Sequence, residues 1–241
     1  SAASDVYKRQ IKDSDGLNVK TPTVRPRATE HIGEIIGIVK DLVESGHAYV
    51  AHNGDVYFRV KSDPGYGKLS HLNLDDLESG NRELRSRMDD DLKEDPADFA
   101  VWKAAKPGEP AWESPWGLGR PGWHIECSAM SMKYLGETFD IHCGGVDNIF
   151  PHHTNEIAQS ESYLGHKWCP YWFHVNHLND QTGKMSKSKG DFLTVSLLES
   201  KGYDPLAYRM FCLQSHYRKP LVFSYDNLDL SLIHISEPTR P

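Results

Sequence analysis

DIHCGGVDNIFPHHTNEIAQSE, residues 140–161, combines the pattern of a strand, a glycine turn and a helix. A β-type run over residues 138–142 breaks at Gly144-Gly145, and the spacing predicts a helix from about Phe150. This order places side chains at the carboxyl end of a strand, where open α/β sheets bind their ligands. The stretch therefore predicts an α/β fold with a ligand site in this segment.

Two side chains of the stretch are candidate metal ligands. His152 and Glu156 are four residues apart, so on a helix they project from one face. A third candidate lies upstream, in Gly122-Trp-His-Ile-Glu-Cys127. Each has a plainer explanation when taken singly, because an isolated histidine is commonly a core or surface group and an isolated cysteine a small buried hydrophobe.

The composition bounds the class of protein. The 241 residues are 38% hydrophobic, enough for one large core or for a core with an inserted subdomain. A net charge of -7 gives no general attraction to nucleic acid or anionic membrane, so any RNA contact requires a local basic patch. No apolar run reaches membrane-spanning length, and no signal-peptide pattern begins the sequence.

Cysteines and histidines add two expectations. The four cysteines form no CxxC pair and no disulfide-scaffold spacing, which predicts reduced thiols in a cytoplasmic protein. Seven of the thirteen histidines fall between His124 and His177, and this crowding predicts a polar site.

The two ends, residues 1–10 and 231–241, do not read like the middle of the chain. SAASDVYKRQ and LIHISEPTRP have neither clear periodicity nor a capping pattern. Both resemble translated sequencing-adapter read-through, with flexible natural tails as the alternative. We interpret both as non-native tails and exclude them from the predicted fold.

Apolar residues at helical spacing predict a helix over residues 32–43, ended by Ser45-Gly46. His31-Ile-Gly33 resembles the start of a HIGH nucleotide-binding signature. However, Glu34 stands in place of the second histidine, and the tripeptide lies within the predicted helix rather than in a turn after a strand. We therefore assign it no binding role.

Residues 47–115 read as a small α+β insertion in a larger α/β domain. Two β-type runs, residues 47–51 and 55–60, flank Asn53-Gly54, which is the strongest short-range signal for a hairpin. Residues 81–93 are highly charged and predicted to be helical, residues 98–106 are amphipathic, and residues 107–122 form a proline- and glycine-rich connection. Four tryptophans are predicted to serve packing alone: Trp102, Trp112, Trp116 and Trp168.

Lys184-Met-Ser-Lys-Ser188 is the sharpest motif and follows a second predicted strand, residues 172–177. Its lysines and serines offer positive charge and hydroxyl donors to a polyphosphate, and stabilising a leaving pyrophosphate is an electrostatic task. A solvated basic linker is the plainer alternative. Residues 194–202 and 204–214 are predicted helices, the second with proline in its first turn.

KMSKS, DIHCGGVDNIFPHHTNEIAQSE and GRPGWHIECSAM together closely resemble the class I cysteinyl-tRNA synthetase family. The resemblance runs from about residue 17 to residue 230 and includes PRATEHI, GDVYFRV, PGYGKLS, DFAVWKAAKPGEP and HYRKPLVFS. It implies an α/β fold: a partial Rossmann-type catalytic domain with an inserted α+β connective subdomain. Residues 11–46 would end its first half, residues 47–115 would be the insertion, residues 116–190 the second half, and residues 191–230 a helical segment.

Several features of the family have no counterpart in this sequence. They are the N-terminal part with its HIGH motif, first strand and zinc cysteine, and the C-terminal domain that reads the anticodon. Cys143 stands where the family often has glycine, and Asp191 follows Gly190 where many class I enzymes have asparagine. We therefore expect a fragment that is inactive by itself.

The resemblance implies roles for individual residues. Cys127, His152 and Glu156 match three of the family's zinc ligands. Trp123, His124 and His153 would lie on the substrate side, with His124, His142 and His153 orienting the ligands through hydrogen bonds. The glycines would approach adenosine, Asp147 would bind ribose hydroxyls, and the two lysines of the motif would be catalytic. The implied nucleotide site consists of Gly144, Gly145, Asp147, Lys184, Met185, Ser186, Lys187 and Ser188.

The implied activity is ATP-dependent activation of L-cysteine to cysteinyl-adenylate and transfer to tRNA(Cys), with one zinc per chain recognising the substrate thiol. A pocket that distinguishes by size alone separates cysteine poorly from serine, whereas a thiolate is a far better zinc partner than a hydroxyl. ATP with Mg²⁺, L-cysteine and tRNA(Cys) are the implied partners of a cytoplasmic enzyme that is monomeric at full length and needs no membrane.

Three alternatives remain. The nearest is a cysteine-activating ligase that transfers cysteine to an amino sugar, as in mycothiol synthesis. A zinc hydrolase lacks the HExxH arrangement of many metalloproteases and leaves KMSKS unexplained. A non-catalytic RNA-binding module is disfavoured by the net negative charge and by the lack of an aromatic-basic RNA motif.

Overall fold

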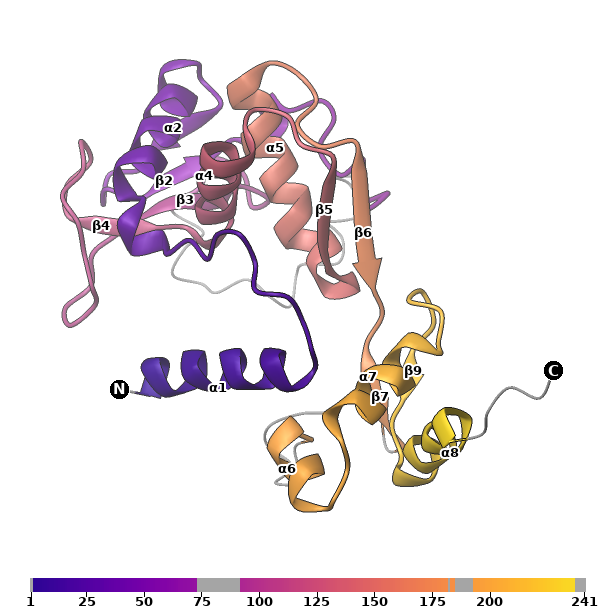
Figure 1. Ribbon diagram of the computed structural model, residues 1–241. Coiled ribbons are helices and arrows are strands. Elements are labelled where there is room, and N and C mark those ends of the chain that lie inside the picture. The colour runs from indigo at the N-terminus through magenta and orange to yellow at the C-terminus, as the bar shows by residue number, and fades with distance from the viewer. Residues whose placement is uncertain (1, 73–91, 182, 185–192, 237–241) are drawn as a thin grey trace. The chain divides into compact units, whose positions relative to one another are not determined.

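The computed structural model describes residues 2–72, 92–181, 183–184 and 193–236. The chain divides into two compact units (Figure 1). The larger unit is Val24–Phe173, and the smaller unit combines Ser1–Thr23 with His174–Pro241. Most of the charged helix predicted at residues 81–93 lies outside the described residues.

The larger unit is built on a four-stranded antiparallel sheet of order β1-β2-β3-β4. The predicted hairpin at Asn53-Gly54 is confirmed. Gly54 has a φ of +90°, and Asn53 Oδ1 accepts a hydrogen bond from the Asp55 N–H at 3.0 Å. The strands are β1 (Ala48–Val50), β2 (Val56–Phe58), β3 (Phe99–Ala104) and β4 (Gly119–Pro121).

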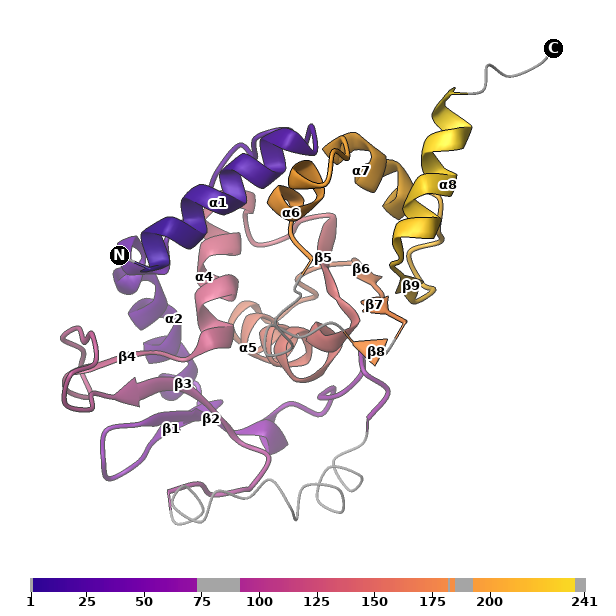
Figure 2. The same cartoon turned by 90° about the horizontal axis from the view of Figure 1, so that it is seen from below.

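Helices α2 (Ile32–Glu44) and α4 (Trp123–Leu135) pack on this sheet, and helix α5 (Thr154–Leu164) packs against both of them (Figure 2). The helix predicted at residues 32–43 is confirmed as α2, and Gly46 follows it with a φ of +81°. One hydrophobic core joins residues from all three helices and from β2 and β3, so the predicted insertion shares its core with its neighbours. Its buried members include Ile35, Val39, Leu42, Val56, Phe58, Val101, Trp102, Ile125, Ala129 and Ala158. Short 3₁₀ turns lie at Ala28–Glu30, Val60–Ser62 and Val146–Asn148.

Two tryptophans and the histidine of the HIGH-like tripeptide are part of the packed interior. Trp102 and Trp168 are fully buried, as predicted for packing residues. His31 is buried just before α2, where its Nδ1–H donates to Arg27 O at 2.7 Å and its Nε2 lies 2.9 Å from the Tyr134 hydroxyl of α4. His31 therefore ties the start of α2 to α4.

The deciding stretch, residues 140–161, differs from its prediction at both elements. Strand β5 (Ile141–Gly145) pairs with β6 (Tyr171–Val175) and runs through the glycine pair that was expected to end it. Helix α5 begins at Thr154 rather than at Phe150, after a wide π-type turn over Ile149–His153. Pro151 is the physical reason, because a proline pushes the preceding residue out of the helical region, and Phe150 is extended with φ -136° and ψ 132°.

The smaller unit has a three-stranded sheet in which β7 (Leu178–Asp180) pairs antiparallel with β8 (Gly183–Lys184) and parallel with β9 (Leu221–Val222). The two helices predicted after the KMSKS motif are confirmed, and Thr194 and Asp204 cap them through their side chains. A second core holds Leu198, Ala207, Phe211, Phe223 and Leu228. The helices are α1 (Ala2–Gly16), α6 (Val195–Ser200), α7 (Pro205–Leu213) and α8 (Tyr225–Ser236).

Helices α1 and α8 include residues 2–10 and 231–236, for which the sequence pattern indicated no regular structure. Tertiary contacts hold the end of α1, because Arg209 Nη1 donates to Leu17 O at 2.8 Å and to Asn18 O at 2.6 Å. In the described part of the chain, no helix is both long and apolar enough to cross a membrane.

Gly122, between β4 and α4, should tolerate no side chain. An added Cβ would lie 2.1 Å from Ala100 O, a main-chain atom of β3 that cannot rotate away. We expect Gly122→Ala to lower the free energy of unfolding by about 1–3 kcal/mol, measured by urea denaturation. The matched control is Gly37→Ala in α2, where an added Cβ meets nothing within 4 Å. It should instead stabilise the protein by about 0.5–1 kcal/mol, and equal effects of the two changes would contradict this account.

Candidate metal centre

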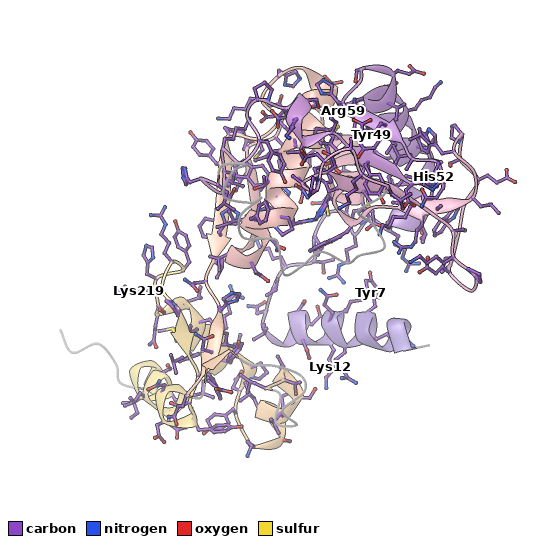
Figure 3. All side chains as sticks on the ribbon, turned by 180° about the vertical axis from the view of Figure 1, so that it is seen from behind. Tyr7, Lys12, Tyr49, His52, Arg59 and Lys219 are labelled. Atoms are coloured by element: carbon purple, nitrogen blue, oxygen red, sulfur yellow. The ribbon has the colours of Figure 1, made fainter. Side chains whose placement is uncertain are left out.

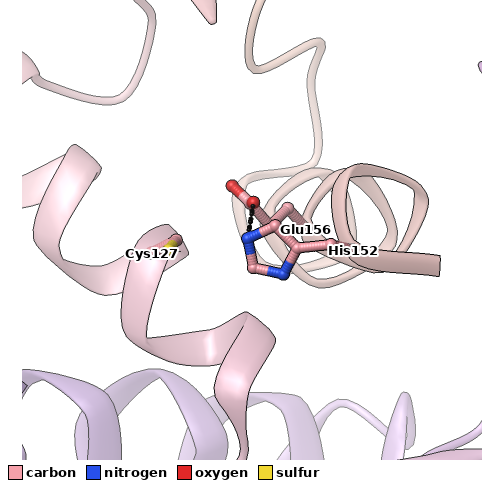
Figure 4. Close-up of side chains that lie close together, drawn as sticks. All are labelled: Cys127, His152 and Glu156. Carbon is pink, nitrogen blue, oxygen red and sulfur yellow. Dashed lines mark ion pairs between the residues drawn. The ribbon is translucent and has the colours of Figure 1, made fainter. Parts of the chain in front are cut away.

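Two helices bring together the three predicted metal ligands (Figure 4). Cys127 projects from the first half of α4, Glu156 from the first turn of α5, and His152 from the π-type turn that precedes it. One ligand atom from each lies within 4.8 Å of the others. His152 Nε2 is 2.7 Å from Glu156 Oε1, which confirms that these two residues share a face.

Glu156 is fully buried and negatively charged. Burial raises the pKa of its carboxyl, but the hydrogen bond from His142 and the close approach of the His152 ring outweigh burial and hold the pKa below its ordinary value. His142 Nε2 lies 2.7 Å from Oε2. Within the described residues, Oε1 accepts no aligned hydrogen bond, although His152 Nε2 is close. Glu156 Oε1 and His152 Nε2 are therefore available to a cation that lies between them.

Cys127 completes a donor set that suits zinc. Burial, together with the negative charges of Glu156 and Glu126, raises the pKa of the Cys127 thiol to about 12. The thiol is therefore protonated at neutral pH, and a bound cation would be needed to displace its proton. Thiolate, imidazole and carboxylate are the ligands found in zinc sites, and three protein ligands leave a position open for a small molecule. The residues present fit the metal.

Two neighbouring side chains, Trp123 and His124, contact the His152 ring and restrict its orientation. Its Nδ1 lies 2.8 Å from His124 Nδ1, and burial lowers the pKa of His124 to about 4, so His124 is neutral. Trp123 stacks on His152 with ring centroids 4.2 Å apart, and 58% of Trp123 is exposed. Phe99 of β3 contacts His124 edge-on at 5.7 Å. The open side of the centre is therefore the side of Trp123.

A second triad was not singled out from the sequence. His142, His153 and Glu156 also bring their ligand atoms within 4.8 Å of one another. His153 is buried, and an added Cβ on Gly144 would lie 2.6 Å from its Cε1. Gly144 therefore makes room for His153, and its approach to adenosine stays a prediction. The crowding of histidines was the only sequence signal for this arrangement.

Trp172 of β6 supports the second triad. Its ring stacks on His142 with centroids 4.6 Å apart, and its Nε1–H donates to Cys169 O at 3.2 Å. The sequence offered no signal for this contact, because it joins two strands that pair only in the folded chain.

A buried polar network lies beside the centre and was also missed. Ser128, next to Cys127, receives hydrogen bonds on Oγ from Gln159 Nε2 and from Ser160 Oγ, each at 3.0 Å. All three side chains are fully buried. The spacing of Gln159 and Ser160 from Glu156, three and four residues, places them on the same face of α5 and was the signal that could have revealed them.

The predicted nucleotide site is only partly described. Gly144 and Gly145 end β5, and Asp147 lies exposed in the 3₁₀ turn that follows. The main chain of Lys184 lies in β8 of the smaller unit. The rest of the motif, Met185, Ser186, Lys187 and Ser188, lies outside the described residues. The nucleotide site as a whole therefore stays a prediction.

His142→Phe should destabilise the chelator-treated protein by about 1–3 kcal/mol, because it removes the donor to Glu156 Oε2 while keeping an aromatic ring against Trp172. The lowered pKa of Glu156 means that its ionised form contributes stability above about pH 4.3, and that this contribution is lost as the pH falls through the folded-state pKa. The loss of unfolding free energy caused by His142→Phe should thus be larger at pH 7 than at acidic pH. Urea denaturation at several pH values measures it, with His166→Phe, an exposed histidine, as the control. Equal deficits in the two variants would contradict the pairing.

Comparison with known proteins places this chain in a family. Residues 1–232 match the family model of the tRNA synthetases class I (C) catalytic domain. The cysteine–tRNA ligase of Caldicellulosiruptor saccharolyticus is 56% identical over 218 residues, which are 90% of this chain and 46% of that protein. That of Symbiobacterium thermophilum is 54% identical over 223 residues, 92% of this chain and 46% of that protein. The chain spans about half the length of the curated relatives it matches.

Solved structures show the same fold at low identity. Methionyl-tRNA synthetase of Mycobacterium tuberculosis in its free state aligns with a TM-score of 0.62 and 13% identity over 97% of this chain and 54% of that chain. Its complex with methionyl-adenylate aligns with a TM-score of 0.61 and 14% identity over 95% of this chain and 54% of that chain. This likeness confirms the predicted fold class, a partial Rossmann-type α/β fold. The chain belongs to the family of class I (C) tRNA synthetase catalytic domains.

Proposed function

We propose that this chain is the catalytic-domain part of a cysteine–tRNA ligase, which activates L-cysteine with ATP to cysteinyl-adenylate and transfers cysteine to tRNA(Cys). The observation that carries the proposal is the Cys127, His152 and Glu156 cluster, whose ligand atoms lie within 4.8 Å of one another. Relatives 54% and 56% identical to the chain that are named cysteine–tRNA ligases support the substrate. Because the chain spans about half of their length, the activity is proposed for the whole protein.

Cysteine selection follows from the chemistry of the cluster. Cys127, His152 and Glu156 would hold one zinc, and the bound metal would supply a soft Lewis acid for the substrate thiolate. Serine has nearly the same size, but its hydroxyl is a poor zinc ligand, so ligation separates the two where size alone cannot. The exposed Trp123 ring on His152 would form the wall against which the amino acid lies.

The nucleotide half of the proposal rests on the motif residues. Gly144 and Gly145 would allow close approach of adenosine, and Asp147 would accept hydrogen bonds from ribose. Lys184 and Lys187 would be catalytic, because their charges stabilise the departing pyrophosphate of ATP·Mg²⁺, with Met185, Ser186 and Ser188 completing the phosphate loop. The protein's own contribution is then positioning and charge stabilisation, without a covalent intermediate. We further propose a cytoplasmic enzyme that is monomeric at full length.

Zinc titration of the metal-free chain should show one zinc per chain. Cys127→Ser and His152→Ala should each weaken zinc binding about tenfold or more. Each change removes a direct ligand, and loss of a group that only hydrogen-bonds to a ligand already lowers metal affinity by about tenfold or more. With cobalt in place of zinc, Cys127→Ser should also lose the sulfur charge-transfer band. Cys212→Ser changes a half-buried cysteine of the smaller unit and should leave both unchanged. A parent chain without zinc, or a Cys127→Ser variant that binds like the parent, would reject the centre.

The 241-residue chain alone should show no cysteine-dependent ATP–pyrophosphate exchange. The nearest match to a HIGH motif begins at His31, and that side chain is occupied by Arg27 and Tyr134 inside the fold. The control is the full-length Caldicellulosiruptor saccharolyticus relative under the same conditions. Exchange by the isolated chain that depends on cysteine would refute this expectation and would show that the residues present suffice for activation.

A further inference from the structure

The turn between α7 and β9 presents a compact set of basic and aromatic side chains. We call residues 216–219, His216-Tyr217-Arg218-Lys219, the basic turn. His216, Arg218 and Lys219 are exposed, and Tyr217 is half-buried. Figure 3 shows Lys219 extending from the smaller unit at this turn.

Hydrogen bonds fix the main chain of the basic turn. Asn176, just before β7, donates from its N–H to Tyr217 O at 2.8 Å and from its Nδ2 to Arg218 O at 3.1 Å. Within the turn, the Lys219 N–H donates to His216 O at 2.9 Å. The turn is thus anchored to the start of β7, and little ordering remains to be done when a ligand binds.

The side chains are stacked on one another. The His216 and Tyr217 rings lie 4.7 Å apart with an interplanar angle of 21°. Arg218 Cζ lies 5.5 Å from the centroid of the Tyr217 ring, a cation–π contact that restrains the guanidinium. The two rings and the guanidinium therefore form one stacked group, with His216 and Arg218 exposed and Tyr217 half-buried between them.

The two cationic side chains of the basic turn are Arg218 and Lys219. Among the described residues, neither Arg218 nor Lys219 forms an ion pair with a carboxylate. By contrast, Lys12 pairs with Glu199 in the same unit, and Arg59 pairs with Glu94 in the larger unit. In a chain whose net charge is -7, such a turn is the kind of local basic patch that an RNA contact requires.

We propose that the basic turn is a contact site for the phosphate backbone of RNA. The identification of this RNA as tRNA rests on the proposed function. Arg218 can bind a phosphate through two parallel N–H groups, and Lys219 supplies a mobile point charge beside it. The exposed planes of His216 and Arg218 suit stacking against an unpaired base. An anionic membrane is a poorer fit, because lipid-binding segments gather more basic residues than this turn has.

Anisotropy titrations with an unmodified tRNA(Cys) transcript, repeated at several salt concentrations, test the inference. The test protein is the Arg218→Ala/Lys219→Ala double variant of the whole chain. It should bind about tenfold more weakly than the parent, and the slope of log affinity against log salt should fall by about 2, one for each phosphate contact removed. A matched control, Lys20→Ala/Lys201→Ala, removes the same charge from the same unit, and its Lys201 also lies over a tyrosine ring, 5.0 Å from the centroid of Tyr225. The control should bind within twofold of the parent.

Each outcome decides between the inference and its rivals. Equal losses in the two double variants, or no RNA binding by the parent at low salt, overturn the contact site. Tighter binding of the parent to phosphatidylserine vesicles than to RNA overturns it in favour of a membrane. An RNA hairpin of unrelated sequence should lose affinity to the same extent, since a backbone contact carries no sequence information. Zinc titration of the same variants keeps the two proposals apart: intact zinc binding with failed RNA contact leaves the ligase proposal standing.

Discussion

The buried carboxylate of Glu156 is the constraint on which the centre of the larger unit depends. A charge without water is costly unless hydrogen-bonding partners surround it. The fold supplies two imidazoles from different elements, His142 from β5 and His152 from the turn before α5. The pairing of β5 with β6 brings Trp172 against His142, and Gly144 leaves space for the neighbouring His153. The surrounding aromatic and imidazole rings thus keep the Glu156 carboxylate ionised and fix its orientation.

Local chemistry decided which parts of the fold could be predicted. Helix α2, the Asn53-Gly54 hairpin and the capped helices α6 and α7 depend on residues close in sequence, and the structure has them all. The start of α5 could not be placed from periodicity, because Pro151 acts on the residue before it rather than on the apolar pattern. Helix α1 escaped recognition because Arg209, distant in sequence, secures its end. The shared core of the insertion and the helices is likewise a tertiary property.

The same distinction applies to the metal centre. His152 and Glu156 could be paired from their spacing alone, since four residues along a helical segment bring side chains together. Residues 122–127 could be named from the sequence as the place of a third ligand, but Cys127 itself was assigned through resemblance to a family, because nothing local indicates that α4 lies beside α5. The partners of the ligands differ again: the contact of His124 with His152 and that of Trp172 with His142 depend on packing between elements. The phosphate-binding half rests on sequence, because the motif from Met185 to Ser188 lies outside the described residues.

Ser128 has a consequence for how the sulfur and the carboxylate come to face each other. Its hydroxyl accepts hydrogen bonds from Gln159 and Ser160. Ser128 is next to Cys127 on α4, and its two partners lie about one turn beyond Glu156 on α5. Sliding α4 by one residue along α5 is a displacement of about 1.5 Å and would break both bonds where no water can replace them. A purely apolar contact would allow the two helices to shift along each other, whereas these two hydrogen bonds fix their register. The distance between the Cys127 thiol and the Glu156 carboxylate is then set by the packing of the helices and does not depend on a bound cation.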